Sequence, residues 1–193
     1  MKITEIKTYP LSLYPGRVSL FIEVLTDNGL KGLGEVGIAR MGKAIIAAIE
    51  HLEERLIGED PWESEKLWQI MFRGNFFPPG VIYSSAISAI DIALWDLKGK
   101  SVNLPLYKLL GGPVRNKVAC YPHTQGSTTQ ELVENSKKAV DEGWKFVRWG
   151  QPETHGVFEQ AGLTQQMPGK LEPTESVRIA TEQMALVREA VGE

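Results

Sequence analysis

The chain has 193 residues, and its 24 acidic against 21 basic side chains give a formal net charge of −3. This balance excludes the basic surface that binds nucleic acid, and no apolar run approaches the roughly 20 residues that cross a bilayer. Cys120 is the only cysteine, which excludes an intrachain disulfide and a cysteine-rich zinc site. We therefore expect a cytoplasmic protein with no nucleic-acid partner and no membrane partner.

The first 36 residues predict three antiparallel strands. Apolar side chains alternate near the N-terminus in a strand that is expected to end at Pro10. Residues 18–26 form the strongest strand pattern and run into Asn28-Gly29, a pair that favours a tight hairpin turn. Residues 30–36 return as a third strand, whose glycines indicate a bend or the close approach of another backbone.

Three helices are predicted next. Residues 43–57 place apolar side chains on one face, and Pro61 occupies the first-turn position of a second helix. A third helix from Ile82 carries one apolar stripe with several small residues, and Gly99 lies where that helix is expected to stop. Strands followed by helices predict a segregated α+β domain that extends to about residue 112.

The third helix carries two carboxylates, Asp91 and Asp96, that could be taken for a catalytic acid pair. They are five residues apart, so they point in different directions from a helix. We expect both to anchor structure.

The pattern changes after residue 113 and alternates between strand and helix. Residues 118–121 and 145–149 predict short strands, and each is followed by a helix, 128–142 and 173–191. This βαβα order is typical of parallel strands with crossover helices. Two such units cannot close a barrel or cover both faces of a sheet, so we expect the chain to be part of something longer.

Several motifs carry a resemblance to a known family. GLGEV at residues 32–36, SAISAIDIALWDLKGK at 85–100 and PLYKLLGG at 105–112 are similar to those of the enolase superfamily, specifically its mandelate racemase and muconate lactonizing group. RGNFFPPG, YPHTQG and FVRWG resemble the acid-sugar dehydratases of the galactonate and mannonate type. The resemblance implies that residues 1–112 form an α+β capping domain and that 113–193 begin a (β/α)₈ TIM-type barrel, which is incomplete.

The resemblance also implies a reaction. In this family Mg²⁺ stabilises an enediolate that forms when a base removes the proton next to the substrate carboxylate. We expect dehydration of a sugar acid, an aldonate, to a 2-keto-3-deoxy acid by a homo-oligomeric hydro-lyase. The Mg²⁺ ligands are expected beyond residue 193, with no metal ligand in this chain, which alone should be inactive. The alternatives are a racemase, epimerase or cycloisomerase of the same superfamily, or a non-catalytic homologue.

Arg148 ends the second expected barrel strand, on the face where such barrels hold their active sites. Racemases and cycloisomerases of the group carry a lysine base there, whereas an arginine clamps carboxylates and hydroxyls, which favours dehydration. In mannonate dehydratases this arginine works with a tyrosine on the next loop. Residues 151–170 contain no tyrosine, with Phe158 near that place, which disfavours mannonate. The alternative for Arg148 is a structural ion pair.

His123 follows the first expected barrel strand and aligns with a substrate-contacting histidine of some of these dehydratases. Histidine changes its charge near neutral pH, which suits proton transfer or a hydrogen bond to a sugar hydroxyl. Both His123 and Arg148 are therefore expected catalytic residues. The alternative for His123 is a loop histidine that is bonded to the backbone.

Capping-domain loops supply specificity in this family, so Arg40 and Phe77 are the expected substrate-binding residues. Arg40 could meet a carboxylate or hydroxyl, and its alternative is an exposed arginine beside a helix start. Phe77 and the adjacent Phe76 could exclude water from the barrel mouth, and their alternative is ordinary core under a loop.

Overall fold

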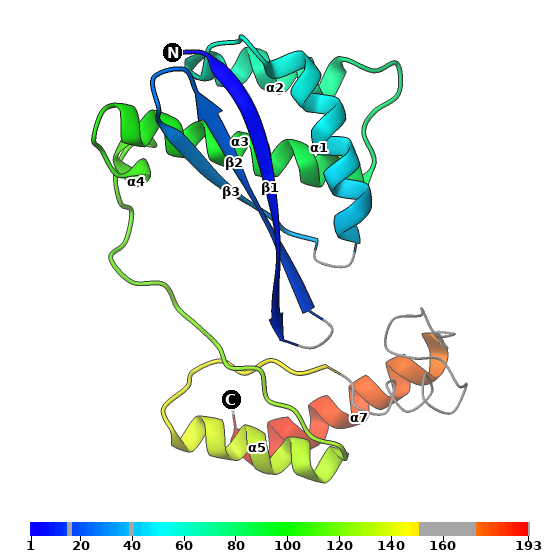
Figure 1. Ribbon diagram of the computed structural model, residues 1–193. Coiled ribbons are helices and arrows are strands. Elements are labelled where there is room, and N and C mark those ends of the chain that lie inside the picture. Colours follow the sequence, from blue (N-terminus) through cyan, green and yellow to red (C-terminus); the bar gives the residue numbers. More distant parts are fainter. Residues whose placement is uncertain (15–16, 39–40, 151–172, 193) are drawn as a thin grey trace. The chain divides into compact units, whose positions relative to one another are not determined.

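The computed structural model describes residues 1–14, 17–38, 41–150 and 173–192 (Figure 1). They form two compact units, Met1–Val114 and Arg115–Glu193, a division two residues after the predicted boundary at residue 112. No helix in the described part of the chain is long and apolar enough to cross a membrane.

The first unit contains the predicted antiparallel meander. Strands β1 (Ile3–Tyr14), β2 (Arg17–Thr26) and β3 (Lys31–Val36) pair in the order β1-β2-β3. The expected strand end at Pro10 is wrong, because β1 continues through Pro10, opposite Leu20, to Tyr14. β1 is an edge strand, and a proline is tolerated there because the outer side of the strand makes no ladder hydrogen bonds.

Helices cover one face of this sheet (Figure 1). The helical elements of the unit are α1 (Gly42–Leu56), the 3₁₀ turn η2 (Pro61–Glu63), α2 (Ser64–Arg73), α3 (Val81–Ser101) and the short α4 (Leu106–Leu109). Of these, α3 packs on β2 and β3, and α1 packs on β1. Every second residue of β3 is buried, as expected for a strand with one covered face. The largest fully buried side chains come from β1, β2, α1, α2 and α3: Ile3, Leu20, Ile22, Ile45, Ile49, Leu52, Leu56, Leu67, Met71, Ile90, Leu94 and Leu97.

The expected helix end at Gly99 is wrong, because α3 continues to Ser101. Gly99 is instead the point where the chain after the helix folds back. The Leu104 N–H donates to the Gly99 carbonyl at 2.9 Å, and a Cβ on Gly99 would lie 2.9 Å from the Leu104 oxygen. The reversal itself falls at Asn103, whose φ of 53° is in the left-handed region that asparagine tolerates.

Helix α3 approaches β3 so closely that no side chain fits between them. A Cβ on Gly32 would lie 2.0 Å from the Ala93 carbonyl oxygen, and one on Gly34 would lie 2.1 Å from that of Ala89. Ala89 and Ala93 are one helical turn apart, so the two glycines face successive carbonyls on one side of α3. The close backbone approach that the sequence predicted is therefore present.

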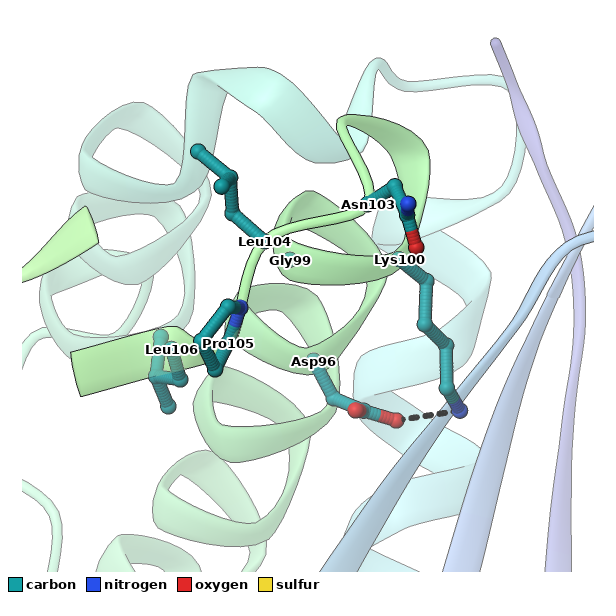
Figure 2. A pocket seen from close by; sticks show the side chains of 7 residues that line it. All are labelled: Asp96, Gly99, Lys100, Asn103, Leu104, Pro105 and Leu106. Carbon is teal, nitrogen blue, oxygen red and sulfur yellow. Dashed lines mark hydrogen bonds and ion pairs between the residues drawn. The ribbon is translucent and has the colours of Figure 1, made fainter. Parts of the chain in front are cut away.

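Asp96 closes the free edge of β3. Its Oδ2 accepts the Leu33 N–H at 2.7 Å and the Lys100 ammonium at 2.6 Å, and Lys100 also donates to the Lys31 carbonyl at 2.8 Å. Figure 2 shows the Asp96–Lys100 pair at a pocket of about 310 Å³ between the end of α3 and the start of α4. The structural role predicted for Asp96 is confirmed.

Lys98 links α3 to the segment that begins α2. Its side chain is buried, and its ammonium donates to the Ser64 hydroxyl. The ammonium also lies 4.4 Å from the ring centroid of Trp95 and 5.9 Å from that of Trp62. Burial lowers the pKa of Lys98, and the two aromatic faces stabilise the charge that burial disfavours.

Replacement of Asp96 by asparagine is expected to lower the free energy of unfolding by about 1–2 kcal/mol, because both of its charge-assisted hydrogen bonds are weakened. Asp91→Asn is the matched control on the same helix. Burial is the main reason that the pKa of Asp91 is raised, so the fold disfavours its charged form and loss of that charge should cost nothing. Urea titrations at neutral pH measure the free energy of unfolding of both variants. Equal losses in the two variants would contradict the structural role of Asp96.

The second unit contains two packed helices, α5 (Thr129–Asp141) and α7 (Pro173–Val191), which confirms both predicted helices. Side chains of both helices are buried: Leu132, Ser136 and Ala139 on α5, and Ile179, Gln183 and Val187 on α7. The Gln183 amide also donates to the Thr129 hydroxyl at 3.3 Å.

The prediction of strands at 118–121 and 145–149 is wrong, because neither range forms a strand in the described structure. One isolated parallel bridge joins His123 to Arg148. Parallel strands are stable when both faces of their sheet are covered. Here Val118 is 76% exposed, and Phe146, which is 58% exposed, borders a hollow of about 490 Å³ next to α7. The lack of cover explains why pairing is limited to a single point.

Candidate active site

The parallel bridge brings the two expected catalytic residues together. The Arg148 N–H donates to the Pro122 carbonyl at 3.1 Å, and the Thr124 N–H donates to the Arg148 carbonyl at 2.8 Å. These bonds place His123 and Arg148 directly opposite each other. Side chains of residues that are paired in this way point to the same face, so an imidazole and a guanidinium leave the backbone side by side.

Tyr121 is a third side chain of this cluster. Its hydroxyl accepts a hydrogen bond from Nη1 of Arg148 at 3.4 Å, and the guanidinium carbon lies 6.0 Å from the ring centroid. The rings of Tyr121 and His123 are stacked, with centroids 6.1 Å apart and planes 27° apart. Tyr121, His123 and Arg148 are all exposed, so their polar atoms can reach a ligand.

The start of α5 fixes the loop that follows His123. Thr128 caps the helix by accepting the Glu131 N–H at 3.2 Å, and Glu131 reaches back to the Ser127 N–H at 2.7 Å. The Asn135 amide donates to the Gln125 carbonyl, which ties the loop to the next turn of the helix. This variant of the capping box ties residues 125–128 to the start of α5, and it so restrains the backbone that follows His123.

The cluster offers donors for an oxyanion and one group that can exchange a proton. Arginine stays protonated and binds carboxylates through its planar fork of N–H groups, and histidine can donate or accept. No three His, Cys, Asp or Glu side chains gather as a possible metal site among the residues that the structure describes. The cluster can therefore bind and polarise an anionic substrate.

The structure describes one of the two expected substrate-binding residues. Phe77 belongs to the first unit, in the loop between α2 and α3, and is 76% exposed. Its ring packs edge-to-face on Phe76 with centroids 5.1 Å apart, and Phe76 is 94% exposed, so ordinary core under a loop is wrong for both. Arg40 lies outside the described residues.

The pocket beside Asp96 is not a second candidate. It contains none of the expected site residues, and its one carboxylate already binds Lys100 (Figure 2). The same carboxylate also accepts the Leu33 N–H. The carboxylate of Asp96, whose Oδ2 accepts both bonds, therefore serves the packing of α3 on β3.

Comparison with known proteins connects the fold to a family. Residues 16–111 match the mandelate racemase / muconate lactonizing enzyme N-terminal domain. A D-galactonate dehydratase family member from Marinomonas sp. (strain MWYL1) is 36% identical over 183 residues, which cover 92% of this chain and 45% of the relative. A crystallised member of the enolase superfamily from Salmonella Typhimurium gives a TM-score of 0.81 at 31% identity, over 100% of this chain and 52% of that one.

The chain belongs to the mandelate racemase / muconate lactonizing enzyme family of the enolase superfamily. An enolase from Pantoea ananatis, solved with bound D-gluconate and Mg, gives a TM-score of 0.78 at 27% identity, over 98% of this chain and 51% of that one. The chain thus spans about half the length of its solved relatives and 45% of the Marinomonas relative. The resemblance that the motifs carried is confirmed.

Sequence reasoning named two members of the cluster and missed the third. Tyr121 and His123 are two residues apart on an extended segment, and that spacing places both side chains on one face. The same alternation could have identified Tyr121 as a neighbour of the residue that pairs with His123, which is Arg148. In this enolase-superfamily chain, residues 121–148 also lie outside the matched family domain, which ends at residue 111.

Proposed function

We propose that the whole protein is an acid-sugar dehydratase, which removes water from an aldonate to give a 2-keto-3-deoxy acid. The observation that carries the proposal is the placement of His123 and Arg148 side by side at the parallel bridge. A relative assigned to the D-galactonate dehydratase family and an enolase solved with D-gluconate support a sugar acid as substrate.

The proposed chemistry divides between the two side chains. A general base outside the described residues takes the proton from the carbon next to the carboxylate. The electron pair left behind places negative charge on the carboxylate oxygens, and the Arg148 guanidinium stabilises that charge. The neighbouring carbon then releases its hydroxyl, which leaves as water after His123 donates a proton to it. The resulting enol becomes the 2-keto acid by gaining a proton at the neighbouring carbon and losing the proton of its hydroxyl group.

Magnesium is part of the proposal, but the described residues do not fit a metal site. Their His, Cys, Asp and Glu side chains nowhere gather in a group of three. Mg²⁺, when bound, supplies a positive charge to the substrate carboxylate. Its ligands would lie outside this part of the chain, and no step assigned to His123 or Arg148 passes through it. A cytoplasmic location and a homo-oligomer belong to the same proposal.

The racemase and cycloisomerase alternatives are disfavoured by Arg148. Their lysine base would occupy this strand end, and a protonated guanidinium is a poor base. The observed cluster holds an arginine and a histidine at that point. No observation specifically favours the non-catalytic alternative.

The test is an assay of the complete polypeptide on aldonates that include D-galactonate, D-gluconate and D-mannonate. We expect a 2-keto-3-deoxy product, detected as its semicarbazone, from at least one acid. Chelation of Mg²⁺ should abolish turnover, and added Mg²⁺ should restore it. The 193-residue chain alone should give none. A complete polypeptide that forms no keto-deoxy product from any aldonate would contradict the proposal.

A further inference from the structure

Tyr121 contacts both proposed catalytic side chains through different parts of its ring. Its hydroxyl bonds to Arg148, and its face stacks on His123. We infer that Tyr121 is a positioning residue, which holds the Arg148 guanidinium and the His123 imidazole in the relative placement that aldonate binding needs. This inference rests on the proposed function, which names only Arg148 and His123.

The need for such a residue follows from exposure. Arg148 is exposed at its isolated bridge to His123, and none of the described salt bridges involves it. A free arginine loses considerable rotamer entropy when it is fixed on a ligand. A side chain that already holds one Nη1 N–H lowers this cost, because the guanidinium is oriented before the substrate arrives.

The geometry leaves the rest of the guanidinium available. Arginine has five N–H donors in a planar fork, and Tyr121 engages only Nη1. The remaining donors can bind a carboxylate in the two-bond arrangement that arginine favours. Tyr121 therefore orients Arg148 without blocking it.

The stacked ring acts on His123 in a different way. With centroids 6.1 Å apart and planes 27° apart, the two rings lie nearly parallel, so the phenyl ring restricts rotation of the imidazole. The hydroxyl and the ring of Tyr121 thus have separable roles, and two substitutions distinguish them. Tyr121→Phe removes the hydroxyl that bonds to Arg148 and keeps the ring beside both side chains, and Tyr121→Leu removes the hydroxyl and the ring.

The first arm of the test measures aldonate dehydration by the complete polypeptide. Tyr121→Phe should lower kcat/KM by about 10-fold, the effect of one lost hydrogen bond to a charged group, mainly through a higher KM. The same change in an Arg148→Met background should have no further effect, because the hydroxyl acts through the guanidinium. Tyr107→Phe, at an equally exposed tyrosine on α4, is the control and should match the wild type.

The second arm does not depend on the reaction. In the 193-residue chain, the ring-proton NMR signals of His123 should shift in Tyr121→Leu, which loses the stacked ring, and should change little in Tyr121→Phe. If the wild-type polypeptide dehydrates no aldonate, the proposed function fails. The NMR measurement then decides alone whether the Tyr121 ring positions the His123 imidazole. Unchanged His123 signals in Tyr121→Leu, or equal losses from Tyr121→Phe with and without Arg148, would overturn the inference.

Discussion

Gly34→Ala is expected to lower the free energy of unfolding of the first unit by at least about 3 kcal/mol, the upper range for an overpacked core. The added Cβ would lie 2.1 Å from the Ala89 carbonyl oxygen and 3.2 Å from a side-chain carbon of Ile22. Neither α3 nor β3 can yield alone, because α3 packs on both β2 and β3, and Asp96 also bonds α3 to the Leu33 N–H of β3. Hydrogen exchange of the β2 and β3 amides, together with a urea titration, measures the loss.

Two further variants separate this clash from a general effect of alanine. Gly37→Ala adds the same methyl group just after β3, where no atom lies within 4 Å, so its effect should stay within about 0.5 kcal/mol. Ala89→Gly in the Gly34→Ala background should not restore stability, because the clash involves the Ala89 backbone. Rescue by that second change, or equal losses at Gly34 and Gly37, would show that the backbones are not in contact.

The first unit could be predicted well because its signals are local. A hairpin dipeptide, glycines at alternate positions and a stripe of apolar residues each identify one element, and their order gives the α+β class. The two errors, at Pro10 and Gly99, have one cause. Proline and glycine each favour the end of a strand or helix considered alone, but neighbouring segments decide where it ends. At Pro10 the strand continues because β1 has a free edge, and at Gly99 the chain folds back through Leu104.

The second unit was harder to predict because its strands depend on what covers them. The sequence gives the parallel direction through the strand–helix alternation, and the His123–Arg148 bridge has that direction. It does not give the extent of pairing, which requires neighbours on both faces. The side-chain contacts of Tyr121 depend on the same pairing, so alternation along one segment could suggest them but not establish them.

Substitution of Arg148 is expected to have the largest effect on the proposed reaction. Arg148→Met should lower kcat/KM for an aldonate by about 10³-fold, the effect of losing a principal donor to developing charge. Arg148→Lys should fall between this variant and the wild type, because it keeps the charge and loses the planar fork. Steady-state kinetics of the complete polypeptide on its best aldonate measures both variants.

The fold should tolerate these changes, because Arg148 is exposed and its bonds to Pro122 and Thr124 use only its own backbone atoms. The unfolding midpoint should therefore stay at the wild-type value while activity falls. Arg188→Met, at an exposed arginine on α7, is the matched control and should retain kcat/KM within about 2-fold. An Arg148→Met enzyme with wild-type kcat/KM would leave the guanidinium without a role in binding negative charge. The bridge would then be a structural contact, and the chemistry would have to come from other residues.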